Sequence, residues 1–338
     1  MKARILVTGG TGYVASWCIA GLLSQGHAVR ATLRSLDKAD RVRSALEKVG
    51  HDVAGLSFAE ADLTDDSGWA DAMTGCEHVL HVASPLGHSG QQTREALVPP
   101  ARDGTLRVLK AATTAGVKRI VMTSAAATAR PSSREDRPAR ETVWADPDIP
   151  DLDPYRLSKI LAERAAWDFM ARQSGTTSLT TILPGAVLGP LLFADTVGSV
   201  QVVQRMLKGQ PPALPNLGFT VTDVRDLADM HIRALVAPQA PGERFLVGGQ
   251  FLWMREIADI LRDGLGSDAK RVPGRRMPDS VFRLLALFIS DLRMFRADLG
   301  RRNDMDTSKA ERMLGFSPRP AEVTLNDCAR NLIALGLA

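Results

Sequence analysis

Short apolar runs alternate along the chain with stretches whose apolar residues recur every three or four positions. Residues 3–7 are mostly apolar and are followed by glycines, which is typical of a buried parallel strand. Residues 13–25 then carry apolar side chains at helical spacing, and Gly26 is placed to end that helix. The N-terminus therefore predicts a strand that turns directly into a helix.

The same alternation continues as far as residue 183. We expect strands at 28–33, 55–61, 78–83, 119–123 and 178–183, and helices at 38–49, 67–73, 94–115 and from 155 onward. Strands that alternate with helices predict an open, doubly wound parallel sheet with right-handed crossovers. The fold class is accordingly α/β, of the Rossmann type.

Beyond residue 184 the pattern changes, because Pro and Gly residues interrupt the chain and the regular alternation lapses. We expect residues 1–184 to form mainly the dinucleotide-binding domain and residues 185–338 to form mainly a smaller C-terminal lobe. The segment at about 219–235 resembles a strand that leads into a capped helix, and we expect it to return to the sheet.

Composition narrows the class of protein. The chain has 338 residues, 45% hydrophobic and 24% charged, which suits one large or two closely packed globular domains. The net charge of +4 is small for this length, and the basic residues lack the aromatic platforms of a nucleic-acid-binding surface. We expect no nucleic-acid partner and no membrane span, because the apolar segment 281–289 is too short and contains Arg283.

Cysteine and histidine usage points to a metal-free protein of a reducing compartment. Cys18, Cys76 and Cys328 are widely separated, which argues against a disulfide framework or a structural zinc site. His78 and His81 are three apart on a predicted strand and would face opposite ways. We expect no metal, and a cytoplasmic location.

A glycine-rich turn lies between the first strand and the first helix. Glycines allow a tight turn and let the backbone approach a pyrophosphate, which then sits on the free N–H groups of the helix N-terminus. The sequence therefore predicts a dinucleotide site. Its residues are Thr8, Gly9, Thr11, Gly12, Tyr13 and Val14.

The residues after the second strand select the cofactor. An NAD-preferring protein places an acidic residue here, but this chain has Arg34, with Lys38 close behind. A guanidinium pairs with a phosphate through two hydrogen bonds, so Arg34 favours the 2′-phosphate of NADP(H). Asp62 and Leu63, after strand three, should border the adenine. Val82, Ala83 and Ser84, after strand four, should border the nicotinamide.

Tyr155 and Lys159 are four residues apart at the start of a predicted helix, so their side chains share one face. A cation beside a phenol favours the phenolate and lowers a pKa that is normally about 10. The pair suits proton transfer near neutral pH. By itself, such a pair is more often an ordinary Tyr and Lys on a helix surface.

Together, the glycine turn, the strand order and the Tyr-x-x-x-Lys pattern resemble the extended short-chain dehydrogenase/reductases. Residues 29–34, 81–85 and 155–167 are similar to the dihydroflavonol reductase and cinnamoyl-CoA reductase branch, which includes microbial aldehyde and ketone reductases. The resemblance implies that Tyr155 donates a proton to a carbonyl oxygen while NADPH delivers hydride. Lys159 would bind the nicotinamide ribose, and Pro184 and Val187 would lie near the nicotinamide amide.

The family's third catalytic residue is a serine just after strand five, and here the chain departs from the pattern. An ungapped alignment places this position on Ala125, between Ser124 and the more distant Thr128. A shift of one residue normally reverses the face of a strand side chain. We expect Ser124 to serve as the catalytic serine, with Thr128 as the alternative.

The sequence thus predicts NADPH-dependent reduction of an aldehyde or ketone to an alcohol. The substrate would be a small carbonyl compound, apolar or aromatic, since Leu86, Leu191, Phe193, Val197, Leu217 and Phe219 suggest an apolar pocket. Two alternatives stay open: a nucleotide-sugar epimerase or dehydratase, and a non-catalytic NADP-binding sensor, which Ala125 would favour. The resemblance also implies a possible homodimer through helices 94–115 and 155–174.

Overall fold

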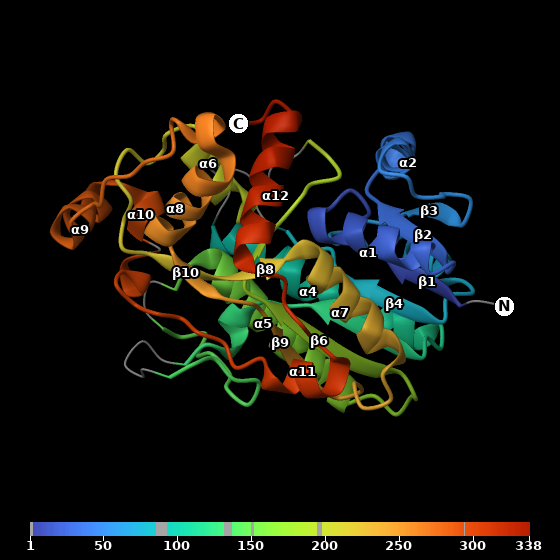
Figure 1. Cartoon of the computed structure of the whole chain (residues 1–338). Helices are drawn as coiled ribbons and strands as arrows, with labels where there is room; N and C mark the ends of the chain where they lie inside the picture. Colours follow the sequence, from blue (N-terminus) through green and yellow to red (C-terminus); the bar gives the residue numbers. More distant parts are fainter. Residues whose placement is uncertain (1–2, 86–92, 132–136, 150–151, 195–197, 294) are drawn as a thin grey trace.

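The chain is organised around one central sheet with helices on both faces (Figure 1). The computed structural model describes residues 3–338 except 86–92, 132–136, 150–151, 195–197 and 294. Seven strands form the central sheet in the order β3-β2-β1-β4-β5-β6-β9, and every neighbouring pair is parallel. Their bounds are β1 Arg4–Val7, β2 Ala28–Leu33, β3 Leu56–Glu60, β4 His78–His81, β5 Arg119–Thr123, β6 Ser178–Pro184 and β9 Arg244–Val247.

Two sets of helices cover the two faces of this sheet. The helices of one face are α1 Tyr13–Ser24, α2 Ala39–Lys48, α7 Val224–Val236 and α11 Ser308–Leu314. Those of the other face are α3 Trp69–Met73, α4 Arg94–Thr114 and α5 Pro154–Ala171. Strand residues alternate between the two cores: in β1, Ile5 and Val7 join the first and Leu6 joins the second.

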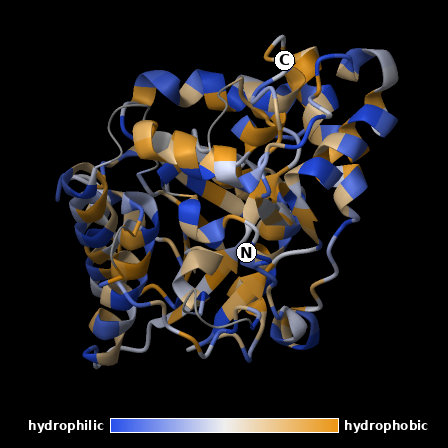
Figure 2. Cartoon of the chain, turned by 90° about the vertical axis from the view of Figure 1, so that its left-hand side faces the viewer, coloured by the Kyte–Doolittle hydropathy of each residue, from blue (hydrophilic) through white to orange (hydrophobic). Residues whose placement is uncertain are grey.

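A second, three-stranded sheet belongs to the C-terminal part of the chain. It contains β7 Ala186–Leu188, β8 Gly218–Asp223 and β10 Phe251–Trp253, in the order β10-β8-β7. Its helices are α6 Val200–Leu207, α8 Met254–Leu265, α9 Asp279–Phe288, α10 Ser290–Arg293 and α12 Ala321–Ala334. They gather on the side of the molecule away from α2 and share a separate hydrophobic core (Figure 1). Figure 2 shows mainly hydrophobic central strands and outer helices in which hydrophobic and hydrophilic residues alternate.

In the described part of the chain, four 3-10 helices complete the regular structure: η1 Leu36–Lys38, η2 Ala126–Ala129, η3 Gly266–Ala269 and η4 Arg296–Asp298. Of these, η2 and η4 are relevant to function, since η2 follows β5 directly and η4 carries Asp298.

The local sequence explains where the helices begin and end. Gly26 ends α1 with a left-handed φ of 73°, and its N–H donates to the carbonyl of Leu23. Asp153 begins α5 by accepting the N–H groups of Tyr155 and Arg156, and Pro154 takes the first helical position. The side chain of Tyr155 is therefore carried on a firmly capped first turn.

The predicted Rossmann-type α/β fold is confirmed, and the first six strands lie where the alternation predicted them. The segment at 219–235 divides between the two parts of the structure: β8 joins the small sheet, whereas α7 packs on the central one. The sequence reasoning missed β9, which adds a seventh strand beside β6. Among the described residues, no helix has the length and apolar character needed to cross a membrane.

Candidate active site

The glycine turn after β1 has a backbone that other residues would not tolerate. Gly9 has a φ of 74°, and a Cβ added there would lie 3.0 Å from the Cβ of Ala83. Gly12 begins α1, and no side chain caps this helix terminus. The first N–H groups of α1 are thus available to an anion, which fits the pyrophosphate of a dinucleotide.

The side chains of Thr8 and Tyr13 in this turn form hydrogen bonds within the protein. Thr8 is fully buried, and its hydroxyl accepts the N–H groups of Val82 at 3.0 Å and Ala83 at 2.9 Å. The Tyr13 hydroxyl donates to the carbonyl of Gly189 at 2.9 Å, so this side chain ties α1 to the segment after β7. The side chain of Thr8 therefore holds the ends of β1 and β4 together instead of facing a ligand. Thr11 and Val14 are partly buried beside them.

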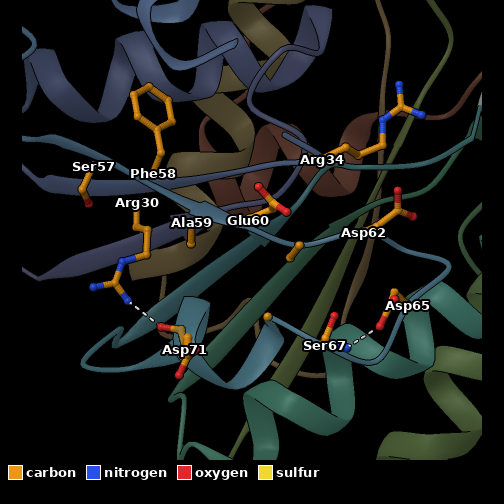
Figure 3. A pocket seen from close by; sticks show the side chains of 12 residues that line it. Arg30, Arg34, Ser57, Phe58, Ala59, Glu60, Asp62, Asp65, Ser67 and Asp71 are labelled. Carbon is orange, nitrogen blue, oxygen red and sulfur yellow. Dashed lines mark hydrogen bonds between the residues drawn. The ribbon is translucent and has the colours of Figure 1, made fainter. Parts of the chain in front are cut away.

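Arg34 and Asp62 lie together beside a hollow of about 740 Å³ at the outer edge of the sheet (Figure 3). The side chains of Arg34 and Lys38 are exposed, as a phosphate site requires. The Asp62 carboxylate accepts the backbone N–H of Thr64 at 2.8 Å and its hydroxyl at 2.7 Å, and with Arg34 nearby these bonds lower the pKa of Asp62. Leu63 packs against Gly104 of α4.

Arg30 lies at the opposite side of this hollow and donates to the carbonyls of Asp71, Ala72 and Thr74. Arg34 is thus the arginine that lies beside Asp62, at the ends of β2 and β3.

Tyr155 and Lys159 lie on the face of α5 that is turned toward the end of β5. Tyr155 is half-buried and lines a pocket, and Lys159 is only 4% exposed. The Lys159 ammonium lies 6.0 Å from the centre of the Tyr155 ring and donates to the carbonyl of Thr123 at 3.5 Å. The structure therefore brings the two predicted residues together.

Burial is the largest cause of the pKa shifts of both side chains. Burial, reinforced by the nearby Asp153 carboxylate, raises the pKa of Tyr155 to about 12. Burial also lowers the pKa of Lys159 to about 8, although Glu163 opposes the shift. The expectation that Lys159 lowers the pKa of Tyr155 is therefore not met in the protein alone, because desolvation of the phenol is the largest effect.

The pocket at Tyr155 has a volume of about 240 Å³ and lies between η2, the start of α5 and the small sheet. Its apolar lining includes Ala125, Pro184 and Phe219. Val187 is partly buried on β7 and packs against the core of the α1 face. Val82, Ala83 and Ser84 follow β4 and are partly buried.

Ser124, predicted to be the catalytic serine, is not among the residues that line this pocket. Its hydroxyl donates to Glu163 Oε2 at 2.6 Å, and the residue is 2% exposed. Alternation along β5 places Ser124 on the same face as Ile120 and Met122, which pack in the core beneath α5. Ala125, the position given by the ungapped alignment, lines the pocket instead.

Thr128, the alternative to Ser124, also forms hydrogen bonds away from the pocket. It is fully buried, donates to the carbonyl of Ala125 at 2.9 Å and accepts from Arg244 Nη2 at 3.0 Å. Both hydroxyls thus belong to a buried network centred on the ion pair of Glu163 and Arg244, whose atoms Oε1 and Nε are 2.9 Å apart.

Sequence reasoning did not identify this network. Its other members include Thr181, which donates to Glu163 at 2.8 Å, and Trp144, whose ring lies 3.7 Å from the Arg244 guanidinium carbon. Burial raises the pKa of Glu163, but Arg244 and the hydrogen bonds lower it overall, so the carboxylate is ionised. A usable signal was present, since Glu163 lies four residues after Lys159 and hence on the same face of α5.

The predicted apolar pocket is largely wrong. Leu191 and Leu217 lie in the core of the small sheet, and Phe193 lies in the core of the α1 face. Leu86 and Val197 lie outside the described residues. Phe219 alone of the six lines the pocket in the part of the chain that the structure describes.

No group of three or more His, Cys, Asp or Glu side chains is placed to hold a metal ion among the described residues. His81 is buried and bonded to Thr8 and Thr105, and burial together with Lys159 lowers its pKa to about 3. This histidine is therefore a neutral core residue.

A glycine turn on a parallel sheet, with a Tyr–Lys pair at a pocket beyond the strand ends, defines a nucleotide-dependent oxidoreductase of the Rossmann type. Residues 5–248 match the NAD dependent epimerase/dehydratase family, and the chain belongs to this family. It is 34% identical over 261 residues to cinnamoyl-CoA reductase 1 of Petunia hybrida, a match that covers 76% of each chain. It is 29% identical over 354 residues to the ketoreductase azaE of Aspergillus niger, covering 98% of each.

Solved structures of reductases are also similar to this chain. The complex of Gre2 from Candida albicans with NADPH has a TM-score of 0.80 and 25% identity, and covers 98% of this chain and 99% of its own. The yeast methylglyoxal/isovaleraldehyde reductase Gre2, also with NADPH, has a TM-score of 0.80 and 25% identity, covering 99% and 100%. These similarities confirm the predicted branch of reductases.

Proposed function

We propose that this protein reduces an aldehyde or ketone to an alcohol with NADPH. The observation that carries the proposal is the Tyr155–Lys159 pair, held at a pocket beyond the carboxyl ends of the strands, on the same sheet as an uncapped glycine turn. The names of the relatives support it, since they are reductases, and NADPH is the cofactor in the Gre2 complexes. They do not favour the epimerase alternative.

The residues of the chain have separable roles in this reaction. NADPH, when bound, supplies the hydride that the carbonyl carbon accepts. The Tyr155 hydroxyl donates a proton to the carbonyl oxygen, which would otherwise carry the developing negative charge. The Lys159 ammonium adds positive charge beside the phenolate that forms. Half-burial of Tyr155 limits competition from water.

The cofactor is proposed to lie along the carboxyl ends of the strands. The N–H groups of Tyr13 and Val14, with Gly9, Thr11 and Gly12, would hold the pyrophosphate. Arg34 and Lys38 would bind the 2′-phosphate, with the adenine over Asp62 and Leu63. At the other end, Lys159, Val82, Ala83, Ser84, Pro184 and Val187 would surround the nicotinamide and its ribose.

This assignment is tested by following NADPH oxidation with aromatic and aliphatic aldehydes and ketones. We expect Tyr155→Phe to lower kcat by about 100-fold or more, because it removes the proton donor without changing the shape of the ring. NADPH binding by the variant should be retained. Full activity of Tyr155→Phe would contradict the mechanism.

A non-catalytic NADP-binding protein is the second candidate, and Ala125 is the observation that favours it. It predicts NADPH binding without turnover of any carbonyl compound, so the same assay separates the two.

Three further assignments accompany the function. Residues 1–184 would mainly bind NADP(H), and residues 185–338 would mainly form the substrate lobe around an apolar or aromatic substrate body. A homodimer would pair α4 and α5, where Leu106 and Leu161 are partly exposed, and sedimentation analysis tests it. Three buried, free cysteines support a reducing, cytoplasmic location.

A further inference from the structure

Helix α9 has an apolar face that is exposed to solvent. With about 3.6 residues per turn, Val281, Leu284 and Phe288 lie on one side of the helix. Leu284 is 58% exposed and Phe288 is 78% exposed. Phe282 and Ala286, on the opposite side, are buried in the core of the small sheet. The helix is therefore anchored by its inner face, and its outer face is also hydrophobic.

The outer face extends to the end of the helix and past it. Leu287 is exposed, and so is Ile289, which directly follows the helix. In Figure 1, α9 protrudes at the outer edge of the C-terminal part, on the side away from α2. A surface helix normally presents polar residues to water, and a contiguous apolar patch on a protein surface marks an interaction site. The exposed face of α9 thus indicates a binding surface.

Positive groups flank this face. Arg283 is exposed and lies four residues before Leu287, so the two side chains are neighbours on the helix. Arg293 is also exposed, and its Nη2 donates to the carbonyl of Leu287 at 3.2 Å, which places a second guanidinium at the end of α9. The carboxylate of Asp279 is instead turned into the protein, since its Oδ1 is buried and a Cβ at Gly300 would lie 3.8 Å from its Oδ2. The apolar face is therefore bordered by arginines.

The sequence around α9 is also basic. Residues 270–295, which connect η3 to η4, contain six basic and two acidic residues. Their net charge of +4 equals that of the whole chain, so the rest of the protein is neutral overall. Four of the basic residues are exposed just before α9, namely Lys270, Arg271, Arg275 and Arg276. The hydrophobic face therefore lies within a basic surface segment.

A partner of this surface must offer negative charge and hydrocarbon together. A second copy of the chain would meet α9 with the same arginines, which repel one another. The surface of a membrane rich in anionic lipids presents negative headgroups above hydrocarbon, which matches a helix with Leu and Phe on one face and Arg beside it. A protruding helix can also lie flat on such a surface without a groove to receive it.

We infer that α9 binds the surface of membranes that contain anionic lipids. Leu284, Leu287 and Phe288 enter the boundary of the hydrocarbon. Arg283 and Arg293 pair with the headgroups. This is binding at the interface and requires no membrane-spanning helix. The inference is independent of the proposed function, because none of these side chains lines the pocket of the candidate active site.

The test measures how much of the full chain sediments with vesicles of phosphatidylcholine that contain about 30% phosphatidylserine. We expect binding that falls at least about tenfold when Leu284→Gln and Phe288→Gln are combined, because two apolar side chains no longer leave water. The matched control combines Val49→Gln after α2 with Val236→Gln at the end of α7, two exposed apolar residues, and should bind within about twofold of the wild type. Arg283→Gln should weaken binding about fivefold, the contribution of one basic residue at an anionic surface.

Urea unfolding should give nearly the same midpoint for the wild type and both double variants, since all four substituted residues are exposed. Binding that is undiminished in the α9 double variant, or equally strong on vesicles of phosphatidylcholine alone, overturns the inference. Absence of binding to the anionic vesicles overturns it as well. In that case, sedimentation velocity shows whether the face joins two copies of the chain, since the α9 double variant would then be a monomer where the wild type is a dimer.

Discussion

Exchanging the roles of Ser124 and Ala125 gives the sharpest test of the site. Ser124→Ala removes a hydroxyl that donates to Glu163 at 2.6 Å in a buried position. A hydrogen bond to a charged group contributes about 1.5–3 kcal/mol to stability. Glu163 keeps the Arg244 and Thr181 donors, so no carboxylate is left unpaired, and we expect a loss of about 2 kcal/mol. Reductase activity should stay within about twofold of the wild type.

Ala125→Ser makes the opposite change, because it adds a hydroxyl to the wall of the pocket that contains Tyr155. A second donor to the carbonyl oxygen would strengthen as negative charge develops there. If it contributes about 1.4 kcal/mol in the transition state, kcat/KM rises about tenfold. The stability of this variant should be nearly unchanged.

Urea unfolding measures the first effect, and NADPH oxidation with one aldehyde at several concentrations measures the second. A fall in kcat of more than about 100-fold in Ser124→Ala, with the free energy of unfolding intact, would refute this reasoning and return Ser124 to catalysis. No gain in Ala125→Ser, with NADPH still bound, would mean that the carbonyl oxygen does not approach Ala125.

Three other predictions concern charged residues. Arg34→Ala should lower the preference for NADPH over NADH by about 10–100-fold in kcat/KM, since it removes a bidentate phosphate contact, whereas Lys48→Ala on exposed α2 should not. Glu163→Gln should lower the free energy of unfolding by about 3–5 kcal/mol, and adding Arg244→Met should recover part of it in a double-mutant cycle. Lys159 has a pKa of about 8 when folded and 10.5 otherwise, so the unfolded chain binds more protons between these values. The free energy of unfolding should therefore rise by about 3 kcal/mol from pH 8 to 10.5 relative to Lys159→Met.

Most of the fold could be predicted because hydrophobic periodicity is strong in buried parallel strands. Strand β5 was predicted at its observed bounds, and α4 and β6 within one residue. Strand β9 was missed because Arg244–Val247 is a short run far along the chain, and its pairing with β6 is set by tertiary packing. The buried Arg244 also makes the strand hard to recognise, since its charge is paired with Glu163, which is distant in the sequence.

The substrate pocket was the least predictable part of the site, because its lining comes from segments far apart in the sequence. Phe219 on β8 and Arg301 after η4 meet near Tyr155 only in the folded chain. Apolar residues such as Leu191 and Phe193 suggested a pocket, but apolar side chains in a loop that packs on the protein are usually core, as both are here.

Strand geometry predicts which way the Ser124 side chain points, but not whether it lies at the pocket. Side chains of β5 alternate, so that Val121 faces the α1 core and Thr123 bonds His231 of α7, while Met122 faces α5. Ser124 must then also face α5, on which Tyr155 lies. Facing α5 is compatible with a catalytic serine, so the face of the strand does not decide the assignment. The position along α5 decides instead: Ser124 bonds Glu163, about two turns beyond Tyr155, whereas Ala125, Ala126 and Ala127 line the pocket.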